Sequence, residues 1–272
     1  MKFTKMHGLG NDFIVIADTQ KHADLKTLAQ KLCSRHTGVG ADGLLIVEQS
    51  DTADIRMRII NSDGSEAEMC GNGIRCFAKY VYEQEIVKKE KMVIQTLAGL
   101  IKPELTIQNG KVVLVKVDMG MPSFEAEKIP TLAQNPMDVQ LEIAGQTVQL
   151  SAVLMGVPHA IVFVEDLQTT DIDTLGEKIE KHDLFPHHIN VDFVQIINRN
   201  TLRMETWERG AGRTLACGTG ATAAGVIAYK KGFCEPTVKV LLSQGSLQIE
   251  YMQDKNAFMS GPAQTVFCGE IL

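Results

Sequence analysis

The stretch EMCGNGIRC, residues 68–76, has a counterpart in LACGTGATA, residues 215–223. Each places a cysteine, Cys70 or Cys217, directly before a glycine, a small polar residue and a second glycine. The likeness extends upstream, because an Arg-Met pair stands at the same distance before each cysteine. An internal repeat of this kind predicts that the chain is built from two matched halves.

The secondary-structure patterns agree with two such halves. A second pair of similar segments follows the two cysteine turns: VIQTLAGLI at 93–101 and VLLSQGSLQ at 240–248, each an apolar run that contains a glycine. In the first half, residues 25–33 place apolar side chains on one helical face, and alternating apolar residues over 55–59 predict a half-buried strand. Both cysteine turns are followed by predicted helices. The second of these, over 221–232, is small and apolar on all sides, so we expect it to be buried.

The middle of the chain is expected to join the halves. Residues 141–150 predict a hairpin that turns at Ala144-Gly145. Prolines interrupt residues 123–137, which we interpret as a linker that crosses between the halves. The expected domains are 1–120 and 121–262, with about 263–272 packing back onto the first.

Composition excludes several classes of protein. The net charge is −6 and no long Lys/Arg cluster occurs, so a nucleic-acid partner is not expected. We expect neither a signal peptide nor a membrane span, because no segment approaches about 20 consecutive apolar residues. The six cysteines include no Cys-x-x-Cys pair, which argues against a zinc framework and a thioredoxin-type motif. These features predict a cytoplasmic protein with reduced thiols.

A cysteine at the start of a helix lies beside unpaired backbone N–H groups and the positive end of the helix dipole. Such a turn binds anions and favours the thiolate. If the two halves face each other across a cleft, one thiolate could remove a proton beside a bound carboxylate while the opposing thiol delivers another. Two other interpretations stay open: Cys70 and Cys217 as buried structural residues, and a single nucleophilic cysteine with His159 as base in a hydrolase. An amino-acid binding module is the non-enzymatic alternative.

Two further motifs do not support a cofactor or a metal. GVGADG, residues 38–43, has the spacing of a dinucleotide-binding loop, but it precedes an apolar strand and does not open a helix. His182, His187 and His188 cluster near Asp183, and we interpret this segment as a solvated loop. We therefore expect neither a cofactor nor a metal ion.

With these residues identified, the chain resembles the diaminopimelate epimerases, which belong to the cofactor-independent amino-acid racemases, over essentially its full length. The resemblance rests on four motifs in the expected order: MHGLGNDF (6–13), GSEAEMCGNGIRC (64–76), NVDFVQ (190–195) and ERGAGRTLACGTGA (208–221). It implies an α/β fold of the α+β type with two pseudo-symmetric domains. Each is a curved, mostly antiparallel sheet wrapped round a central helix, with the active site in the cleft between them.

The resemblance also implies roles for individual residues. Cys70 and Cys217 are the acid/base pair that interconverts LL- and meso-diaminopimelate, with His159 near one thiol and Glu208 near the other. The substrate is held by the side chains of Asn11, Asn61, Asn190, Glu208 and Arg209 and by the backbone of Gly71, Asn72, Gly218 and Thr219. A small amino acid is thus the expected partner, and the family implies a homodimer.

Three positions depart from the family pattern. Val157 stands where many members have a substrate-contacting Asn, Gly43 where some have Gln, and Arg213 where Glu is frequent. A related racemase for another amino acid is therefore the alternative function. The cluster that includes Asn61 and Arg209 favours a substrate with a second amino-acid end.

Overall fold

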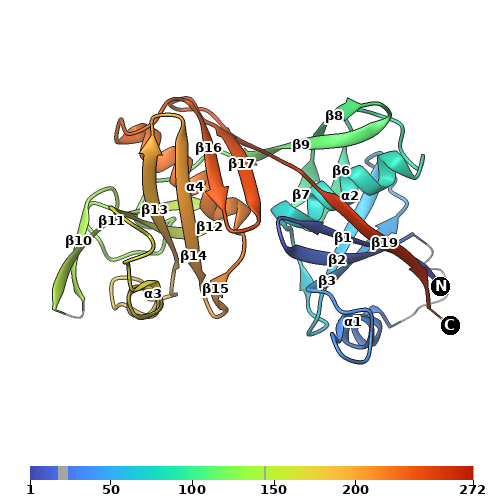
Figure 1. The fold of residues 1–272 in the computed structure, drawn as a ribbon, viewed down its shortest axis with the longest axis horizontal. Coiled ribbons are helices and arrows are strands. Elements are labelled where there is room, and N and C mark those ends of the chain that lie inside the picture. Colours follow the sequence, from blue (N-terminus) through green and yellow to red (C-terminus); the bar gives the residue numbers. More distant parts are fainter. Residues whose placement is uncertain (18–23, 144, 272) are drawn as a thin grey trace. The chain divides into compact units, whose positions relative to one another are not determined.

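The protein is described here from a computed structural model, in which residues 1–17, 24–143 and 145–271 are described. The chain divides into two compact units (Figure 1). Unit 1 comprises Met1–Val117 and Ser260–Leu272, and unit 2 comprises Asp118–Met259. The chain leaves unit 1 within β9 (Lys111–Gly120) and returns within β18 (Ala257–Gly261).

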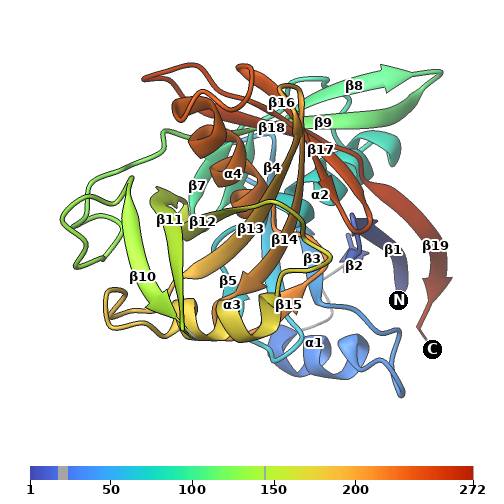
Figure 2. The same cartoon turned by 60° about the vertical axis from the view of Figure 1, so that its left-hand side comes forward.

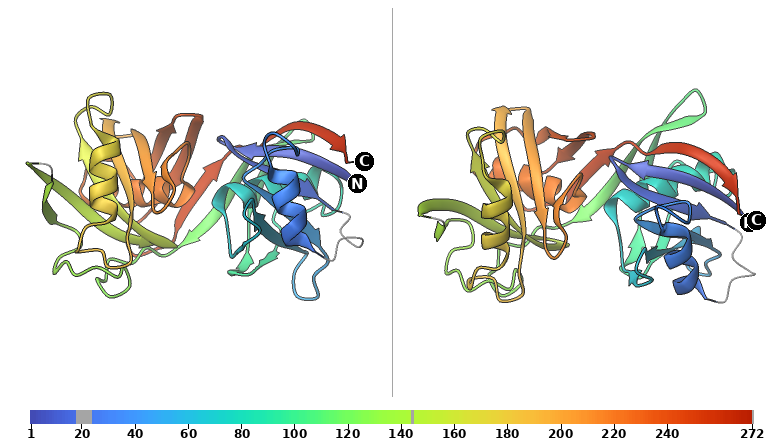
Figure 3. Two further views of the ribbon diagram at one scale, coloured as in Figure 1. Left: turned by 90° about the horizontal axis from the view of Figure 1, so that it is seen from below. Right: turned by 60° about the horizontal axis from the view of Figure 1, so that its bottom comes forward.

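In its described residues, unit 1 is a sheet with the strand order β19-β1-β2-β3-β4-β6-β7 together with helices α1 and α2. The strands and helices are β1 (Lys2–Gly8), β2 (Asn11–Ile16), α1 (Leu25–Cys33), β3 (Gly43–Glu48), β4 (Ile55–Asn61), β5 (Glu66–Ala67), α2 (Gly71–Glu83), β6 (Ile94–Thr96), β7 (Gly99–Ile101), β8 (Glu104–Gln108) and β19 (Gln264–Glu270). β5 pairs with β4, and β8 forms a hairpin with β9. The C-terminal strand β19 runs antiparallel beside β1 (Figure 3).

Unit 2 repeats this arrangement in a sheet with the strand order β10-β11-β12-β13-β14-β16-β17, which continues through β18 and β9 to β8. The elements are β10 (Val139–Ile143), β11 (Gln146–Met155), β12 (Val157–Val164), α3 (Ile172–Glu180), β13 (Asn190–Asn198), β14 (Thr201–Glu208), β15 (Gly212–Thr214), α4 (Gly218–Lys230), β16 (Thr237–Leu242) and β17 (Gly245–Glu250). Every pairing along β1-β2-β3-β4-β6-β7 has the same direction as its counterpart along β11-β12-β13-β14-β16-β17. The repeat in the sequence is therefore a structural repeat.

The second repeated segment of the sequence, 93–101 and 240–248, forms an equivalent β-hairpin in each unit. β6 and β7 close with Thr96 opposite Gly99, and β16 and β17 close with Leu242 opposite Gly245. Both glycines have positive φ, 110° and 140°, which side chains rarely adopt. The predicted strand over 55–59 is β4, in which buried and half-buried residues alternate as expected.

Each unit encloses one helix within its curved sheet. α4 contacts β11–β14, β16 and β17 (Figures 1 and 2), and nearly every residue of the helix is buried, as its apolar composition predicts. In unit 1, β3 is buried on both faces. Leu44 and Ile46 pack in the cluster that contains α1, and Leu45 lies against the start of α2.

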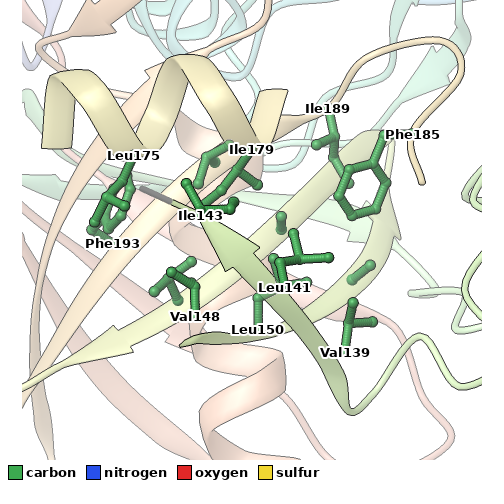
Figure 4. Packing of buried hydrophobic residues seen from close by; sticks show 14 of the residues in the cluster. Val139, Leu141, Ile143, Val148, Leu150, Leu175, Ile179, Phe185, Ile189 and Phe193 are labelled. Carbon is green, nitrogen blue, oxygen red and sulfur yellow. The ribbon is translucent and has the colours of Figure 1, made fainter. Parts of the chain in front are cut away.

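The unit 2 core shows why the predicted linker was wrong. β10 and β11 form the expected hairpin, with Ala144 outside the described residues, and their inward residues pack against α3 and β13 (Figure 4). Ile129 and Ala133 are buried in the same cluster. Residues 123–137 thus belong to unit 2, and the chain crosses earlier, within β9. Prolines prevent a regular helix or strand there, but they do not prevent packing.

Candidate active site

Cys70 caps helix α2. Its backbone is extended, with φ −143° and ψ 120°, and its sulfur accepts the N–H of Gly73 at 3.4 Å. A residue with an extended backbone and a side-chain acceptor is what a helix N-terminus requires, because its first N–H groups have no partner within the helix. The helix therefore begins where the Cys-Gly-x-Gly motif placed it.

Cys217 caps α4 in the same way. Its φ and ψ are −118° and 111°, and its sulfur accepts the N–H of Gly220 at 3.4 Å. Each unit thus holds one thiol against the amide-rich end of its central helix. The resemblance assigns carboxylate binding to the backbone at Gly71, Asn72, Gly218 and Thr219, which are the first two residues of each helix.

The strand registers show which residues of the two units are equivalent. Phe13 pairs with Gly43 between β2 and β3, and His159 pairs with Asn190 between β12 and β13. Phe13 therefore occupies the place of His159, and Gly43 that of Asn190. In the next pair of strands, β3–β4 and β13–β14, Asn61 corresponds to Glu208. Asn11 corresponds to Val157, because each lies two residues before the equivalent residues Phe13 and His159. The repeat thus carries different side chains at equivalent places.

The neighbours of Cys70 are amides. Its sulfur lies 3.5 Å from Asn11 Oδ1, and Asn72 Nδ2 donates to the same oxygen at 3.3 Å. Asn11 Nδ2 in turn donates to Asp42 Oδ2 at 2.7 Å. The structure therefore brings three of the predicted site residues, Cys70, Asn11 and Asn72, into direct contact.

Cys217 lies in a network of polar side chains. Its sulfur is 3.3 Å from Thr219 Oγ1, and that hydroxyl is 3.1 Å from His159 Nε2. His159 Nδ1 is 2.7 Å from Asp192 Oδ2, and Asp192 Oδ1 accepts from Thr206 Oγ1 at 2.7 Å. His159 and Asp192 are fully buried. The carboxylate fixes the imidazole so that Nδ1 carries a proton and Nε2 is left to accept one.

Glu208 also lies near Cys217, so within unit 2 this thiol has both His159 and Glu208 beside it, whereas the resemblance implied one of them for each thiol. Glu208 accepts from Thr214 Oγ1 at 2.6 Å, and burial raises its pKa, an effect that this hydrogen bond partly offsets. Burial raises the pKa of Cys217 well above its ordinary value, and the carboxylates of Glu208 and Asp192 raise it further. The surroundings of Cys217 therefore hold it as a thiol, and the prediction that the helix start alone favours the thiolate is wrong for this cysteine, because burial and the two carboxylates outweigh the backbone N–H of Gly220.

The other residues that the resemblance assigns to substrate binding, Asn61, Asn190 and Arg209, lie at or next to the ends of strands. Asn190 Nδ2 donates to Pro158 O at 3.0 Å and Asn190 Oδ1 accepts from Arg209 N at 2.9 Å. Arg209 is exposed and donates to His187 O. Asn61, at the end of β4, donates to Ser65 Oγ at 3.0 Å. Asn190 thus joins two backbone segments of unit 2.

The structure shows the surroundings of Val157, Gly43 and Arg213, the positions at which the sequence is expected to depart from the family pattern. Val157 is 37% exposed at the start of β12, so it places a methyl surface where its equivalent Asn11 has an amide. A Cβ added at Gly43 would lie 2.9 Å from Ile60 O, so this backbone leaves no room for a larger residue there. Arg213 pairs with Glu205, which ties β15 to β14.

Two carboxylates near the site, those of Asp192 and Glu180, were not predicted from the sequence. Asp192 lies within the quoted NVDFVQ motif, and a lone carboxylate in an apolar strand was the available signal. Glu180, at the end of α3, accepts from Trp207 Nε1 at 2.7 Å and from Gly210 N at 3.0 Å. It therefore holds the turn that carries Glu208 and Arg209.

Gly220 and Gly73 are equivalent, yet they differ in the space around them. A Cβ at Gly220 would lie 2.4 Å from Asp192 Oδ1, whereas one at Gly73 would lie 3.3 Å from Leu45 Cδ2. We expect Gly220→Ala to destabilise the protein by about 2–3 kcal/mol and Gly73→Ala by less than about 1 kcal/mol. Urea unfolding of both variants measures the difference, and equal losses would contradict this account.

Asp12, beside Asn11, supports the first half of the site. Its carboxylate binds Lys5 and Arg35, and although burial raises its pKa, hydrogen bonds from Arg35 and Lys5 outweigh this and lower the pKa from 3.8 to about 2. The charged form is thus favoured in the folded state. The ion pairs of Asp12 therefore contribute fully to the free energy of unfolding above pH 4, and this contribution is lost as the pH falls towards 2.

We therefore expect Asp12→Asn to lower the free energy of unfolding by about 2 kcal/mol at pH 7, with the difference from the natural protein shrinking below pH 4. Urea titrations at several pH values measure this. Glu127→Gln, which changes an exposed carboxylate, is the control and should have little effect. A loss that does not depend on pH would contradict the ion-pair explanation.

Across the described ranges 1–17, 24–143 and 145–271, no group of three or more His, Cys, Asp or Glu is placed to hold a metal ion. Over the same part of the chain, no helix is long and apolar enough to cross a membrane.

Comparison with known proteins relates the whole chain to one family. The family model described as Diaminopimelate epimerase matches residues 3–125 and 151–266. A diaminopimelate epimerase of Caldanaerobacter subterraneus subsp. tengcongensis is 53% identical over 273 residues, covering 100% of this chain and 99% of the relative. That of Moorella thermoacetica is 50% identical, covering 99% of each.

Solved structures with low sequence identity share the fold. A probable proline racemase from Agrobacterium radiobacter K84 superposes with a TM-score of 0.69 at 18% identity, covering 100% of this chain and 92% of the other. A PhzF-family phenazine biosynthesis protein of Bacillus anthracis gives 0.73 at 15% identity, with coverage of 100% and 99%. The expected fold class, mixed α and β with two sheet-rich domains, is confirmed.

Proposed function

Because the chain belongs to the diaminopimelate epimerase family, we propose that it interconverts LL- and meso-2,6-diaminopimelate by inverting one α-carbon. The observation that carries this proposal is the pair of matched thiols, each capping the central helix of its unit. One thiolate removes the α-proton and the other thiol delivers a proton to the opposite face. The reaction supplies precursors of lysine and peptidoglycan.

The difficult step is the removal of a weakly acidic α-proton. As the proton leaves, negative charge develops on the α-carboxylate, which becomes enediolate-like. Backbone N–H groups of Gly71 and Asn72 in one turn, and of Gly218 and Thr219 in the other, are the donors that stabilise this charge. His159, with Nδ1 held by Asp192, and Glu208 exchange protons with the reacting thiols.

We assign the second amino-acid end of the substrate to Asn61, Asn190, Glu208 and Arg209. A guanidinium such as that of the exposed Arg209 suits a distal carboxylate, because it makes two parallel hydrogen bonds. Catalysis that needs two free thiols fits a reducing compartment, so we place the enzyme in the cytoplasm.

The purified protein tests this proposal when it is incubated in deuterated water with LL-diaminopimelate and, separately, with a panel of L-amino acids. We expect α-deuterium to enter diaminopimelate as meso product forms, as followed by NMR and chiral chromatography. Exchange into another amino acid alone would indicate the related racemase. Cleavage of a substrate without exchange would indicate a hydrolase, and neither outcome is compatible with the proposal.

We also propose that the enzyme is a homodimer that forms through β19. In the described part of unit 1, β19 is the last strand of the sheet order, and Val266 and Phe267 are 55% and 47% exposed. An exposed apolar edge strand is suited to pairing with a second copy. Sedimentation velocity should show a dimer that Val266→Lys weakens, and a monomer at all concentrations would exclude it.

A further inference from the structure

Glu180, the last residue of α3, is a buried carboxylate that contacts three other segments of unit 2. Its Oε2 accepts from Trp207 Nε1 of β14 at 2.7 Å, and its Oε1 accepts from Gly210 N, in the turn after β14, at 3.0 Å. Oε1 also lies 3.4 Å from Nδ1 of His188, in the segment that leads into β13. Only 5% of the Glu180 side chain is exposed. One buried side chain thus joins a helix, a strand end, a turn and a loop.

Glu180 carries a negative charge in this buried position. Burial raises its pKa, but hydrogen bonds from Trp207, Gly210 and His188 outweigh this and lower the pKa below its ordinary value. The carboxylate is therefore ionised at neutral pH and can only accept hydrogen bonds. A buried charge is costly, and apolar residues in such a place often stabilise a protein equally well. Stability alone therefore does not explain why a carboxylate occupies this position.

The equivalent turn of unit 1 is also tied to the helix that precedes it. Asn61 corresponds to Glu208, so Asp63 in the turn after β4 corresponds to Gly210 in the turn after β14. Gln30 Nε2 of α1 donates to Asp63 O at 2.8 Å. That contact is made by a neutral, exposed side chain, whereas the contact in unit 2 is made by a buried carboxylate. The repeat thus keeps a contact between helix and turn, and only unit 2 places a buried charge in it.

The turn that Glu180 holds fixes Arg209 on both sides. The N–H of Arg209 donates to Asn190 Oδ1 at 2.9 Å, and its guanidinium donates to His187 O at 3.0 Å. The next N–H in the chain, that of Gly210, donates to Glu180. The histidine that follows His187 contacts the same carboxylate. Both the backbone and the guanidinium of Arg209 therefore lie on segments that Glu180 holds together.

Glu208 is held by other contacts. It is the last residue of β14 and pairs with Gly212 of β15. Its carboxylate accepts from Thr214 Oγ1 at 2.6 Å. These contacts keep Glu208 in place without the carboxylate of Glu180. A change at Glu180 should therefore displace Arg209 more than Glu208.

We propose that Glu180 is a positioning residue that sets the Arg209 guanidinium to bind the distal carboxylate of the substrate, and that it thereby determines the preference for an amino acid with a second carboxylate. A guanidinium binds a carboxylate through two parallel hydrogen bonds, which require a fixed orientation. A displacement of about 1 Å is enough to lose much of such an interaction. The inference rests on the proposed function in one respect, because that proposal assigns the distal carboxylate to Arg209.

The test compares Glu180→Ala and Glu180→Gln with the natural protein. Alanine leaves both the indole of Trp207 and the N–H of Gly210 without this acceptor. Glutamine has a single acceptor oxygen, which we expect to face the partly buried indole, because water can reach the exposed Gly210. Both variants therefore release the turn, and the second does so with almost no change in side-chain volume.

We expect the KM for diaminopimelate to rise about 10-fold in both variants, while kcat stays within about 3-fold of the natural value. Competitive inhibition by L-2-aminopimelate, which keeps the distal carboxylate, should weaken by a similar factor. Inhibition by L-lysine, which has no distal carboxylate, should not change. An unchanged KM in a folded Glu180→Ala protein, or an equal loss for both inhibitors, would overturn the proposal.

Trp207→Phe is the matched control. It removes the indole donor but leaves the carboxylate of Glu180 to accept from Gly210. It also loses packing against α3, because a Cβ added at Gly176 would lie only 2.6 Å from the Trp207 side chain. Trp207→Phe should therefore lower the free energy of unfolding and yet keep the natural KM. A rise in KM as large as that of Glu180→Ala would show a general loosening of unit 2 and would overturn the positioning role.

The inference and the proposed function fail in different ways. Backbone ¹⁵N relaxation at Arg209 and Gly210 needs no turnover, and it should show a more mobile turn in Glu180→Ala. A mobile turn in a protein that epimerises no diaminopimelate would reject the proposed function, and with it the distal carboxylate as the ligand of Arg209. Normal epimerisation with an unchanged KM and a rigid turn in the variant would reject the role of Glu180 and leave the proposed function intact.

Discussion

Replacing either Cys70 or Cys217 with serine is expected to lower the rate of epimerisation by about 10²–10⁴-fold, while the KM for diaminopimelate changes little. A hydroxyl occupies nearly the same space as a thiol and can still accept from Gly73 or Gly220, so the helix cap remains. A serine hydroxyl is, however, a much weaker acid than a thiol. The substitution therefore removes the proton transfer at one face and leaves binding in place.

The two variants should also differ from each other. With only one thiol left, each can remove the α-proton from just one of the two isomers and return a deuteron to the same face. In deuterated water we expect each variant to exchange the α-hydrogen of one isomer without inverting it, and the preferred isomer should be opposite for Cys70→Ser and Cys217→Ser. NMR of both isomers measures this exchange. The two-base mechanism would be rejected if either single variant kept the natural rate of inversion.

The parts of this fold that sequence could predict are those set by local signals. Helix caps are local, because an extended residue with a side-chain acceptor followed by small residues is enough to begin a helix. For this reason the starts of α2 and α4 at Cys70 and Cys217, and the repeat itself, could be found from the motifs alone. The burial of α4 followed from its lack of a polar face.

The environment of each thiol could not be predicted in the same way. His159 and Asp192 meet because β12 and β13 run parallel with His159 opposite Asn190, and a crossover through α3 separates these strands in the chain. Nothing in either strand alone fixes that register. The position of Glu180 was equally hidden, since a glutamate at the end of a helix is usually solvated, and only the fold shows that this one is buried.

Asp192→Asn is the second substitution with a large expected effect. Asp192 Oδ1 accepts from Thr206 Oγ1, which leaves Oδ2 to accept from His159 Nδ1–H. In the variant the amide oxygen still satisfies Thr206, so the amide NH₂ must face Nδ1 and the imidazole must carry its proton on Nε2. His159 can then no longer accept a proton at Nε2, the nitrogen that faces Thr219.

We expect Asp192→Asn to lower kcat by about 10²–10⁴-fold with little change in KM, because the imidazole stays in place but is held in the wrong tautomer. Stopped assays with LL-diaminopimelate measure this, and ¹⁵N NMR of the imidazole reports the tautomer directly. Thr206→Val is the matched control: it removes the other hydrogen bond to the carboxylate, yet leaves His159 Nδ1–H with its acceptor, so it should retain most of the activity. The orienting role of Asp192 would be refuted if Asp192→Asn kept natural turnover, or if Thr206→Val lost as much activity while both proteins remained folded. In either case the buried carboxylate would serve packing and not the proton transfer.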